Sequence, residues 1–522
     1  MTEHYLIGLD YGTESARGVL IDVRDGRVAA SHTHSYRHGV MSTALPCGTA
    51  LPPFWALQDA ADYLEAAEAV LGALGRGRTV CGIGLGFTAS TPLPAKADGT
   101  PLSSFHPNQP HAYVKLWKHG AAQPWADRIT AEGGAFLNDV GGKLSANSLI
   151  AKAAEMADST PALWAETDRF IEAADWLVWQ LTGKEIRSAA LATYKANHKP
   201  GVGYPDHLVP ELAAKLAEPQ AVGTSAGSLS ATWRERTGID GAALVAIPVI
   251  DSHMVVPSAG AIEAGTLVGA LGTSAVFLLL DDTARPLPLG IEGVGRDGVL
   301  PGFWCYEAGQ AGFGDILGWF VRSFPQGGSV EESFAHYNEA ARSLKPGESG
   351  IVALDWWNGN RVPFGDTLLT GLFVGMTMRT SAAHLYRALL ESLCFGARSI
   401  IDHLAAGGAP IKRIVLTSGL SLSNPVLMQL MADVLKREVH VPQTKNLTAV
   451  GGAIHAAVAA GVTAGYAEAV QRYAATTPLT YRPAPEAAHV YDALYRIYEE
   501  LGSNTANRST MYLLNSIVQS VS

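Results

Sequence analysis

One loop pattern occurs twice in the sequence, about half a chain apart, and it constrains the fold more than any other feature. Two apolar runs, at residues 5–10 and 18–23, flank the loop Tyr11-Gly-Thr-Glu-Ser15, and two more flank Gly272-Thr-Ser274. Each pattern predicts a pair of strands around a short loop that contains glycine. A hairpin repeated at the length of a domain indicates duplication, so we expect two similar α/β domains whose loops face each other across a cleft.

The rest of the chain alternates apolar strands with amphipathic helices, as an α/β fold requires. The runs that predict these elements are strands at 79–85 and 413–417, a helix around 176–181 and a helix over 384–395. Three prolines between residues 478 and 485 predict a linker, and the apolar stripe that starts at Tyr491 predicts one terminal helix. The expected domains are residues 1–257, residues 258–487 and a helical tail over residues 488–522.

Composition excludes several classes of protein. The net charge is −10 and basic residues form no long cluster, which argues against a nucleic-acid partner. The four cysteines show no CxxC spacing, so neither a disulfide framework nor a zinc site is expected, and a reducing cytoplasm is the predicted location. The N-terminus does not resemble a signal peptide, and the apolar run 449–460, which includes His455, is too short for a membrane span and predicts a buried helix.

The two repeated loops are not chemically equal. When Gly12-Thr13 is aligned with Gly272-Thr273, Asp10 lies opposite Ala270, so only the first loop offers a carboxylate. Glycine allows backbone N–H groups to approach a phosphate, threonine adds a hydroxyl, and Asp10 can hold hydrated Mg²⁺. A tight turn is the alternative for each loop taken alone. Together the loops favour a site for the phosphates of ATP with one magnesium ion held from one side.

Asp251 follows the apolar run 243–250 and is the best candidate for a catalytic base. Transfer of a phosphoryl group to an alcohol needs an acceptor for the hydroxyl proton, and a carboxylate at the end of a strand can supply it. The alternative is the N-cap of a helix. We interpret the nearby His253 as a supporting or packing residue.

Three further polar segments have a functional and a structural interpretation each. Glu307 lies among small residues after an aromatic strand, where it could bind a sugar hydroxyl or cap a turn. The segment Lys115-Leu-Trp-Lys-His119 fits a sugar-binding wall or a solvated helix face. The segment from Thr417 to Asn424 joins a strand to a helix and fits a nucleotide-binding turn or an ordinary connection.

These motifs together resemble the FGGY carbohydrate kinases, the superfamily of glycerol kinase and xylulokinase, over nearly all of the chain except the last thirty or so residues. The segments that carry the resemblance are 8–15, 114–119, 194–195, 251–253, 272–274, 306–310, 354–361 and 427–429. The resemblance implies a duplicated actin-like, ribonuclease-H-like fold, with ATP on the second domain and a ketose mainly on the first.

The resemblance also implies the site residues. Asp251 is the expected base, and Ala89, Lys195 and Glu307 line the expected sugar site. The expected ATP contacts are Gly12, Thr13, Gly272, Thr273, Ser274, Gln310, Gly419 and Asn424, and Asp10 is the expected magnesium ligand.

Two segments point to one branch of the family. Leu116-Trp-Lys-His119 and Asp355-Trp-Trp-Asn-Gly-Asn-Arg361 resemble the members that phosphorylate ribulose, and lack the Trp-x-Asp pattern of xylulokinase-like members. The expected reaction is phosphorylation of L-ribulose to L-ribulose 5-phosphate, with D-ribulose as a second substrate, in arabinose catabolism. Another ketose or a pentitol, such as xylulose or ribitol, and a non-catalytic actin-like ATPase are the alternatives. The sequence leaves the oligomeric state open, with a homodimer among the possibilities.

The chain departs from the family pattern at three places. Family members typically carry Asp where this chain has Gly86, Ala or Cys where it has Ser252, and a Gly-Gly pair where it has Ser418-Gly419. Gly86 lies just before the segment expected to line the sugar, so it bears on sugar preference.

Overall fold

The computed structural model describes residues 3–205, 207–288, 290–474 and 477–521. Contacts within the chain divide it into two compact units. The first unit comprises Met1–Ile262, Val294–Cys305 and Asn446–Thr476, and the second comprises Glu263–Gly293, Tyr306–Lys445 and Thr477–Ser522. Each predicted domain is one continuous stretch of sequence. The contacts instead assign Asn446–Thr476, which comes late in the sequence, to the first unit.

The first unit contains most of the short elements of the chain. Its strands are β1 (His4–Tyr11), β2 (Ser15–Asp22), β3 (Val28–Ser35), β4 (Leu57–Gln58), β5 (Thr79–Phe87), β6 (Pro92–Ala95), β7 (Val114–Lys115), β8 (Arg169–Glu172), β9 (Ser225–Ser228), β10 (Leu244–Ala246) and β11 (Val249–Ile250). Its helices are α1 (Ala60–Gly75), α2 (Gln123–Glu132), α3 (Leu149–Ser159), α4 (Pro161–Glu166), α5 (Ala173–Thr182), α6 (Ala189–Ala196), α7 (Leu212–Lys215), α8 (Ala231–Thr237), α9 (Val255–Ser258), α15 (Leu447–Ala459) and α16 (Tyr466–Tyr473).

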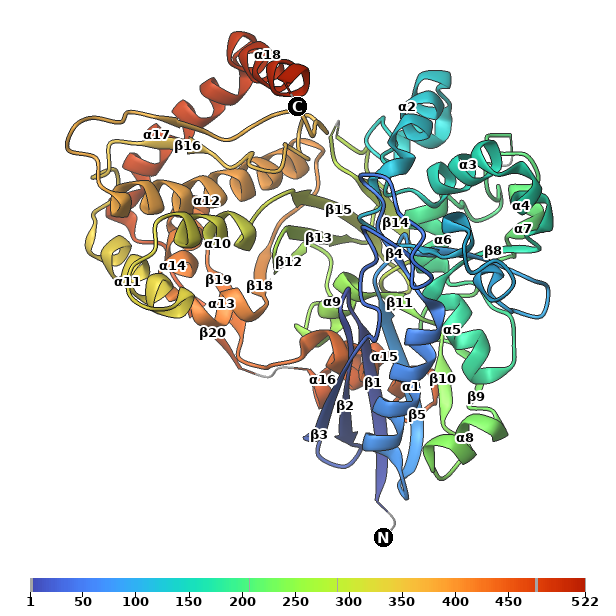
Figure 1. Cartoon of the computed structure of the whole chain (residues 1–522). Coiled ribbons are helices and arrows are strands. Elements are labelled where there is room, and N and C mark those ends of the chain that lie inside the picture. The colour runs from blue at the N-terminus through green and yellow to red at the C-terminus, as the bar shows by residue number, and fades with distance from the viewer. Residues whose placement is uncertain (1–2, 206, 289, 475–476, 522) are drawn as a thin grey trace. The chain divides into compact units, whose positions relative to one another are not determined.

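The main sheet of this unit has the order β3-β2-β1-β5-β10-β9, and β11 also pairs with β5. Helix α1 packs on one face of the sheet and α15 packs on the other (Figure 1). Successive side chains of a strand point to opposite faces, so Ile7 joins the core beneath α1 while Leu6 joins the core beneath α15.

Glycines in the central strands let α15 lie directly on the sheet. A Cβ atom on Gly8 would come within 1.7 Å of the Ala449 carbonyl oxygen, and one on Gly84 within 1.8 Å of the Gly452 carbonyl oxygen. No side chain fits between these backbones, so the alternating glycines of β5 are a packing requirement. This contact explains why a segment from late in the sequence belongs to the first unit.

The second unit is built around another seven-stranded sheet, with the order β14-β15-β13-β12-β18-β19-β20. Its elements are β12 (Thr266–Leu271), β13 (Ala275–Asp281), α10 (Gly314–Ser323), α11 (Val330–Ser343), β16 (Val352–Leu354), β17 (Leu372–Val374), α12 (Ala382–Ala406), β18 (Arg413–Thr417), α13 (Gly419–Ser423), α14 (Pro425–Leu435), β19 (Val439–Pro442), β20 (Pro478–Tyr481), α17 (Ala488–Ser503) and α18 (Thr505–Val521). Strands β14 (Gly293–Arg296) and β15 (Trp304–Gln310) cross the boundary between the units in sequence.

Both predicted hairpins are confirmed. Strand β1 pairs antiparallel with β2, and β12 with β13, while each first strand also pairs in parallel with a later strand, β5 or β18. In these parallel pairs Asp10 lies beside Gly86, and Ala270 lies beside Thr417. The two residues therefore occupy equivalent places, next to the end of the first strand of their hairpins.

Several sequence-based boundaries need correction. The apolar run 243–250 forms two strands instead of one, because Pro248 has no N–H to donate to a ladder. The predicted proline linker begins with β20, an edge strand, where proline is tolerated. Glu307 lies within β15 and not after it.

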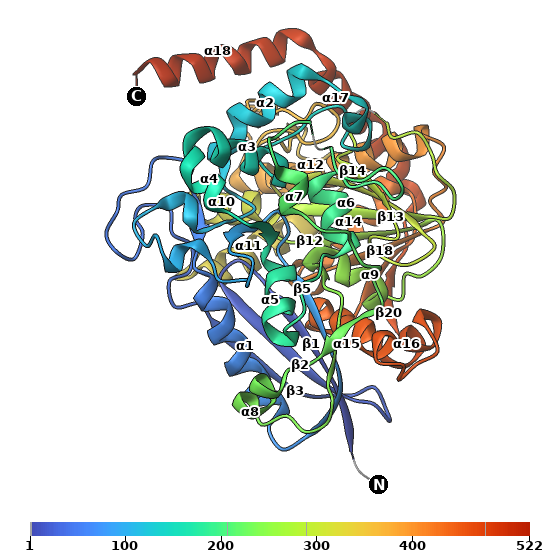
Figure 2. The ribbon, with the colours of Figure 1, turned by 90° about the vertical axis from the view of Figure 1, so that its right-hand side faces the viewer.

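The end of the chain also differs from the prediction. The expected terminal helix is α17, which packs on α12, α14 and β16 through Tyr491, Tyr495 and Tyr498. A second helix, α18, follows it, so the expected helical tail consists of two helices instead of one; Figure 2 shows α18 as the red helix at the C-terminus. No helix within the described residues is long and apolar enough to cross a membrane.

Candidate functional site

Three parallel strands bring polar residues to one edge of the sheet in the first unit. Strands β1 and β11 both pair in parallel with β5, and Asp10 and Val249 flank Gly86 in the same row. Asp251 follows β11 directly, in a 3₁₀ turn over Asp251–Met254. The carboxyl ends of these strands therefore bring together the predicted metal ligand and the predicted base.

The two carboxylates influence each other. Burial, and then the charge of Asp251, raise the pKa of Asp10 to about 7, although Arg17 at 4.0 Å opposes the shift. The Asp10 side chain is still 18% exposed, so a ligand can reach it from solvent. A cation beside Asp10 would relieve this repulsion, which fits the expected role in metal binding.

The glycine at position 86 has a structural reason in this chain. A Cβ atom there would lie 2.8 Å from Cγ of Met254, which is buried, and 3.4 Å from Cα of Asp251. Met254 fills the space that a side chain at position 86 would need. An Asp, as in other family members, would require Met254 to move.

Each predicted phosphate loop is closed by a backbone hydrogen bond, which joins residues three apart in the first loop and two apart in the second. The Gly12 N–H donates to the Ser15 carbonyl at 3.0 Å, and the Gly272 N–H donates to the Ser274 carbonyl at 2.9 Å. The first loop is held from the side by Gln58, whose amide donates to the carbonyl of Thr13 at 2.7 Å. Both loops are thus closed turns at the ends of their hairpins.

The predicted sugar residues of the first unit lie on two elements near Asp251. Ala89 lies in the turn after β5, where the Thr88 N–H donates to the Tyr11 carbonyl at 3.0 Å. Lys195 lies in the last turn of α6, and its neighbour Tyr194 packs edge-on against the ring of His253 at 4.7 Å. His253 thereby packs α6 against the turn that carries Asp251, which agrees with the packing role expected for it.

The segment Lys115–His119 is neither a solvated helix face nor a simple wall. Lys115 lies in β7 and is fully buried, where its ammonium contacts Glu155 at 2.8 Å. His119 is also buried, 3.1 Å from the same carboxylate. The indole of Trp117, by contrast, is 38% exposed. Trp117 and the neighbouring Lys118 are the exposed aromatic and basic residues of this segment, so these two can reach a ligand without rearrangement.

In the second unit, the loop after β12 is held against the start of α10. The Phe313 N–H donates to the Thr273 carbonyl at 2.7 Å, and the Gly314 N–H donates to the Gly272 carbonyl at 3.0 Å. Gly419 begins α13 after the parallel strand β18, and nothing lies within 4 Å of the position of a Cβ there. These predicted ATP residues thus follow two adjacent parallel strands, with open space beside Gly419.

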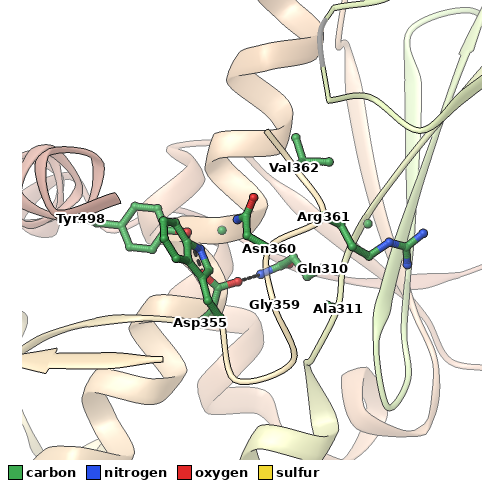
Figure 3. Close-up of a pocket in the computed structure, with 11 residues that line it drawn as sticks. Gln310, Ala311, Asp355, Gly359, Asn360, Arg361, Val362 and Tyr498 are labelled. Atoms are coloured by element: carbon green, nitrogen blue, oxygen red, sulfur yellow. Dashed lines mark hydrogen bonds between the residues drawn. The ribbon is translucent and has the colours of Figure 1, made fainter. Parts of the chain in front are cut away.

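Two other predicted ATP contacts have internal partners. Asn424 caps α14 by accepting from the Leu427 N–H at 3.0 Å, and its amide group donates to Asn338. The Gln310 amide donates to Asp355 at 2.7 Å in a small cavity that Tyr498 also lines, as Figure 3 shows. The side chains of both residues are largely buried and support the fold around the expected site.

Glu307 lies beside a partly exposed ion pair in the same unit. Its backbone carbonyl accepts from the Glu292 N–H, and Glu292 forms an ion pair with Arg361. Burial lowers the pKa of Arg361, but the charges of Glu292 and Glu307 outweigh it and raise the pKa overall. Arg361 belongs to the segment that suggested ribulose, so this segment lies close to the predicted sugar contact.

Sequence reasoning missed three buried charged residues behind the turn that carries Ala89. They are Lys152, Glu172 and Asp175, each at most 3% exposed. No local pattern marks them, because their partners lie far away in the sequence. Among the described residues, no group of three or more His, Cys, Asp or Glu side chains could hold a metal ion.

Comparison with known proteins identifies the family. The model of the FGGY family of carbohydrate kinases, C-terminal domain, matches residues 267–460. A ribulokinase of Halalkalibacterium halodurans is 39% identical, over 96% of this chain and 95% of the relative. A ribulokinase of Geobacillus thermodenitrificans is 40% identical, over 96% of this chain and 94% of the relative.

Solved structures show the same fold at lower sequence identity. A xylulose kinase from Rhodospirillum rubrum has a TM-score of 0.82 at 24% identity, covering 95% of this chain and 98% of that one. A ligand-bound xylulose kinase from Lactobacillus acidophilus has a TM-score of 0.83 at 18% identity, covering 96% and 99%. With relatives of this identity matched over almost its entire length, the chain belongs to the FGGY family of carbohydrate kinases.

Proposed function

We propose that this chain transfers the γ-phosphoryl group of ATP to a hydroxyl of ribulose. The observation that carries the proposal is the identity of 39–40% to two ribulokinases over 96% of the chain. L-ribulose is the expected preferred substrate and L-ribulose 5-phosphate the product, with D-ribulose as a second substrate. Arabinose catabolism is the pathway that this reaction would serve.

Asp251 is the proposed base. It follows a strand end in a short turn, beside the turn that carries Ala89 and beside the helix that carries Lys195. A carboxylate in this place can accept the proton of the attacking hydroxyl as the new bond to phosphorus forms. Ala89, Lys195 and Glu307 are the proposed contacts to the sugar.

The two hairpin loops are the proposed phosphate contacts. The N–H groups of Thr13, Thr273 and Ser274 can bind phosphate oxygens without a basic side chain, while Gly12 and Gly272, which have no side chain, let the backbone come close to the phosphates. Gly419 has open space beside it, which suits a bound nucleotide. Gln310 and Asn424 are also proposed contacts to ATP, and their side chains are held by hydrogen bonds to Asp355 and to the Leu427 N–H.

Asp10 is the proposed ligand of Mg²⁺. Magnesium is usually held by one or two carboxylates together with water and substrate phosphates, so one acidic residue suffices on the protein side. Burial, and then the charge of Asp251, raise the pKa of Asp10, and a cation beside the two carboxylates would favour the charged form of Asp10. When bound, the ion would supply charge neutralisation to the phosphates.

The test is a panel of L-ribulose, D-ribulose, xylulose and ribitol, with ADP release measured by a coupled assay. The highest kcat/KM is expected with L-ribulose. A clear preference for xylulose or ribitol would overturn the choice of substrate. ADP release at the same rate with and without sugar would instead favour an ATPase that does not phosphorylate sugar.

A further inference from the structure

A buried ammonium group lies behind the turn that carries Ala89. Lys152, on α3, is fully buried, and its Nζ donates to the Ser90 carbonyl, to the Ser90 hydroxyl at 2.9 Å and to the Leu116 carbonyl at 2.9 Å. An ammonium has three N–H donors, so these contacts use all of them. All three N–H donors of Lys152 are therefore bound to two loop segments, one that contains Ser90 and one that contains Leu116.

The two segments that Lys152 joins are both expected to lie at the sugar site. Ser90 follows Ala89, and Leu116 precedes the exposed Trp117. Ser90 also has φ of 60°, a left-handed conformation that is unfavourable for a residue other than glycine. Such a conformation persists only when surrounding contacts hold it in place, and the two bonds from Lys152 to Ser90 do so.

Glu172 holds the next residue of the same turn. Located at the end of β8 and fully buried, it accepts the Thr91 N–H through Oε2 at 2.8 Å. Burial lowers the pKa of Lys152 and raises the pKa of Glu172, while the opposite charge of each partner counteracts the shift of the other. The two groups thus compensate each other's charge in the interior.

Asp175, one turn along the chain from Glu172, anchors the helix that carries Lys195. Its Oδ1 accepts the N–H of Ser188, the N-cap of α6, at 3.0 Å. The Ser188 hydroxyl in turn donates to the Pro248 carbonyl at 2.6 Å, just before the strand that leads to Asp251. The start of α5 is therefore connected to the segments of Ala89, Lys195 and Asp251.

We infer that Lys152 and Glu172 are positioning residues for the sugar, which fix the turn 88–91 against the Trp117 segment without touching substrate themselves. This inference rests on the proposed function, since it assumes that these segments line the sugar site. It predicts that affinity for the pentulose depends on the pair much more strongly than affinity for ATP, since the phosphate loops are linked to these segments only by the contact between Trp117 and Thr13.

The principal test replaces Lys152 by Met, which keeps the length of the side chain and removes its donors. KM for L-ribulose should rise about 10-fold or more, the value of a lost charge-assisted hydrogen bond, while KM for ATP changes by less than about twofold. In the free enzyme, amide hydrogen exchange should become faster in peptides that cover residues 88–91 and 116–117. This second measurement does not depend on which sugar is the substrate.

A matched control separates positioning from general destabilisation. Arg387 and Glu391 form a buried ion pair, at 2.8 Å on α12 of the second unit, and Glu391 also has one buried oxygen without a hydrogen-bond partner among the described residues. Glu391→Gln should lower thermal stability but leave both KM values and the exchange of residues 88–91 as in the wild type. Equal changes of KM for the sugar in K152M and E391Q would overturn the inference.

Glu172→Gln keeps the test decisive if K152M does not fold. The amide can still accept the Thr91 N–H, but it no longer compensates the charge of Lys152, so KM for L-ribulose should rise about threefold or more. Wild-type KM and wild-type exchange in this variant would overturn the inference. A wild-type enzyme that phosphorylates none of the pentuloses would overturn the proposed function, and the exchange measurements would still decide whether the pair holds the turn.

Discussion

The indole Nε1 of Trp117 donates a hydrogen bond of 3.0 Å to the hydroxyl oxygen of Thr13. The two residues are 104 positions apart in the sequence, and each belongs to a different predicted motif. Thr13 lies in the first phosphate loop, and Trp117 lies in the segment that suggested ribulose. One contact within the first unit therefore links the expected phosphate and sugar sites.

Trp117→Phe should affect both substrates. Phenylalanine keeps an aromatic face but has no N–H, so the Thr13 hydroxyl loses its orientation. KM for ATP and KM for the sugar should each rise roughly 2- to 10-fold, which corresponds to the loss of one neutral hydrogen bond. Trp125→Phe is the matched control, because the Trp125 indole donates to Asp158 in an exposed position away from both motifs. An effect of similar size in the control would refute the link.

Asp251→Asn should lower turnover and leave binding nearly unchanged. A positioned base contributes roughly 10²- to 10⁴-fold, and asparagine of the same shape cannot accept the proton. Steady-state kinetics with calorimetric binding of sugar separates the two effects. Asp240→Asn, at an exposed position shortly before β10, should behave as the wild type. Retention of more than about a tenth of wild-type turnover in D251N would remove Asp251 from this role.

Asp10→Asn should raise the magnesium concentration needed for half-maximal activity. The first hairpin has a carboxylate where the second has Ala270, so the residue should be the main protein ligand. The measurement is a magnesium titration of activity at fixed ATP, with Asp22→Asn on the same hairpin as the control. If the titrations of D10N and wild type coincide, the ion is held by other groups.

Acid should destabilise the protein through His455. This residue of α15 is fully buried, and burial lowers its pKa from 6.5 to about 3. As the pH falls below 6.5, this histidine becomes protonated in the unfolded chain but stays neutral in the folded chain. The stability contributed by the neutral imidazole is therefore complete above pH 6.5 and is lost progressively as the pH falls toward 3. Between pH 7.5 and 5 this loss amounts to about 2 kcal/mol.

The check is urea unfolding of wild type and His455→Gln at these two pH values. Glutamine does not titrate in this range, so the variant should lose less stability than the wild type between pH 7.5 and 5. His489→Gln, at an exposed position of α17, should leave the pH dependence unchanged. Parallel pH profiles of H455Q and wild type would show that His455 does not cause the acid sensitivity.

Gly86→Ala should destabilise the first unit. The added methyl group would lie 2.8 Å from Cγ of the buried Met254, and overpacking of a core usually costs about 1–3 kcal/mol. Gly465→Ala, where nothing lies within 4 Å of the new atom, is the control. Thermal unfolding should show a lower midpoint for G86A than for wild type, and the decrease caused by Gly86→Ala should be smaller when it is made in a Met254→Ala background. An unchanged unfolding midpoint of G86A would mean that the Met254 side chain moves aside for the methyl group without loss of stability.

Local patterns in the sequence predicted the elements that form the ends of the site. Strand β18 has the predicted bounds, because a short continuous apolar run between polar residues favours a strand without reference to distant residues. The same local information placed Asp10 and Asp251 at strand ends, and the equivalence of Asp10 and Ala270 followed from the repeated hairpin. The motifs also predicted the family that the relatives confirm.

Only the tertiary structure decided which distant segments meet. Helix α15 packs on the first sheet because the backbones at Gly8 and Gly84 leave no space for side chains, and no pattern within either segment states that the other is its partner. Lys152 contacts Ser90 across 62 positions of sequence, and Glu172 contacts Thr91 across 81. The sequence alone determined the two hairpins and the polar residues that they carry. The packing of the folded chain determined which residues hold them in place, because a buried charge is stable only where the fold supplies its partners.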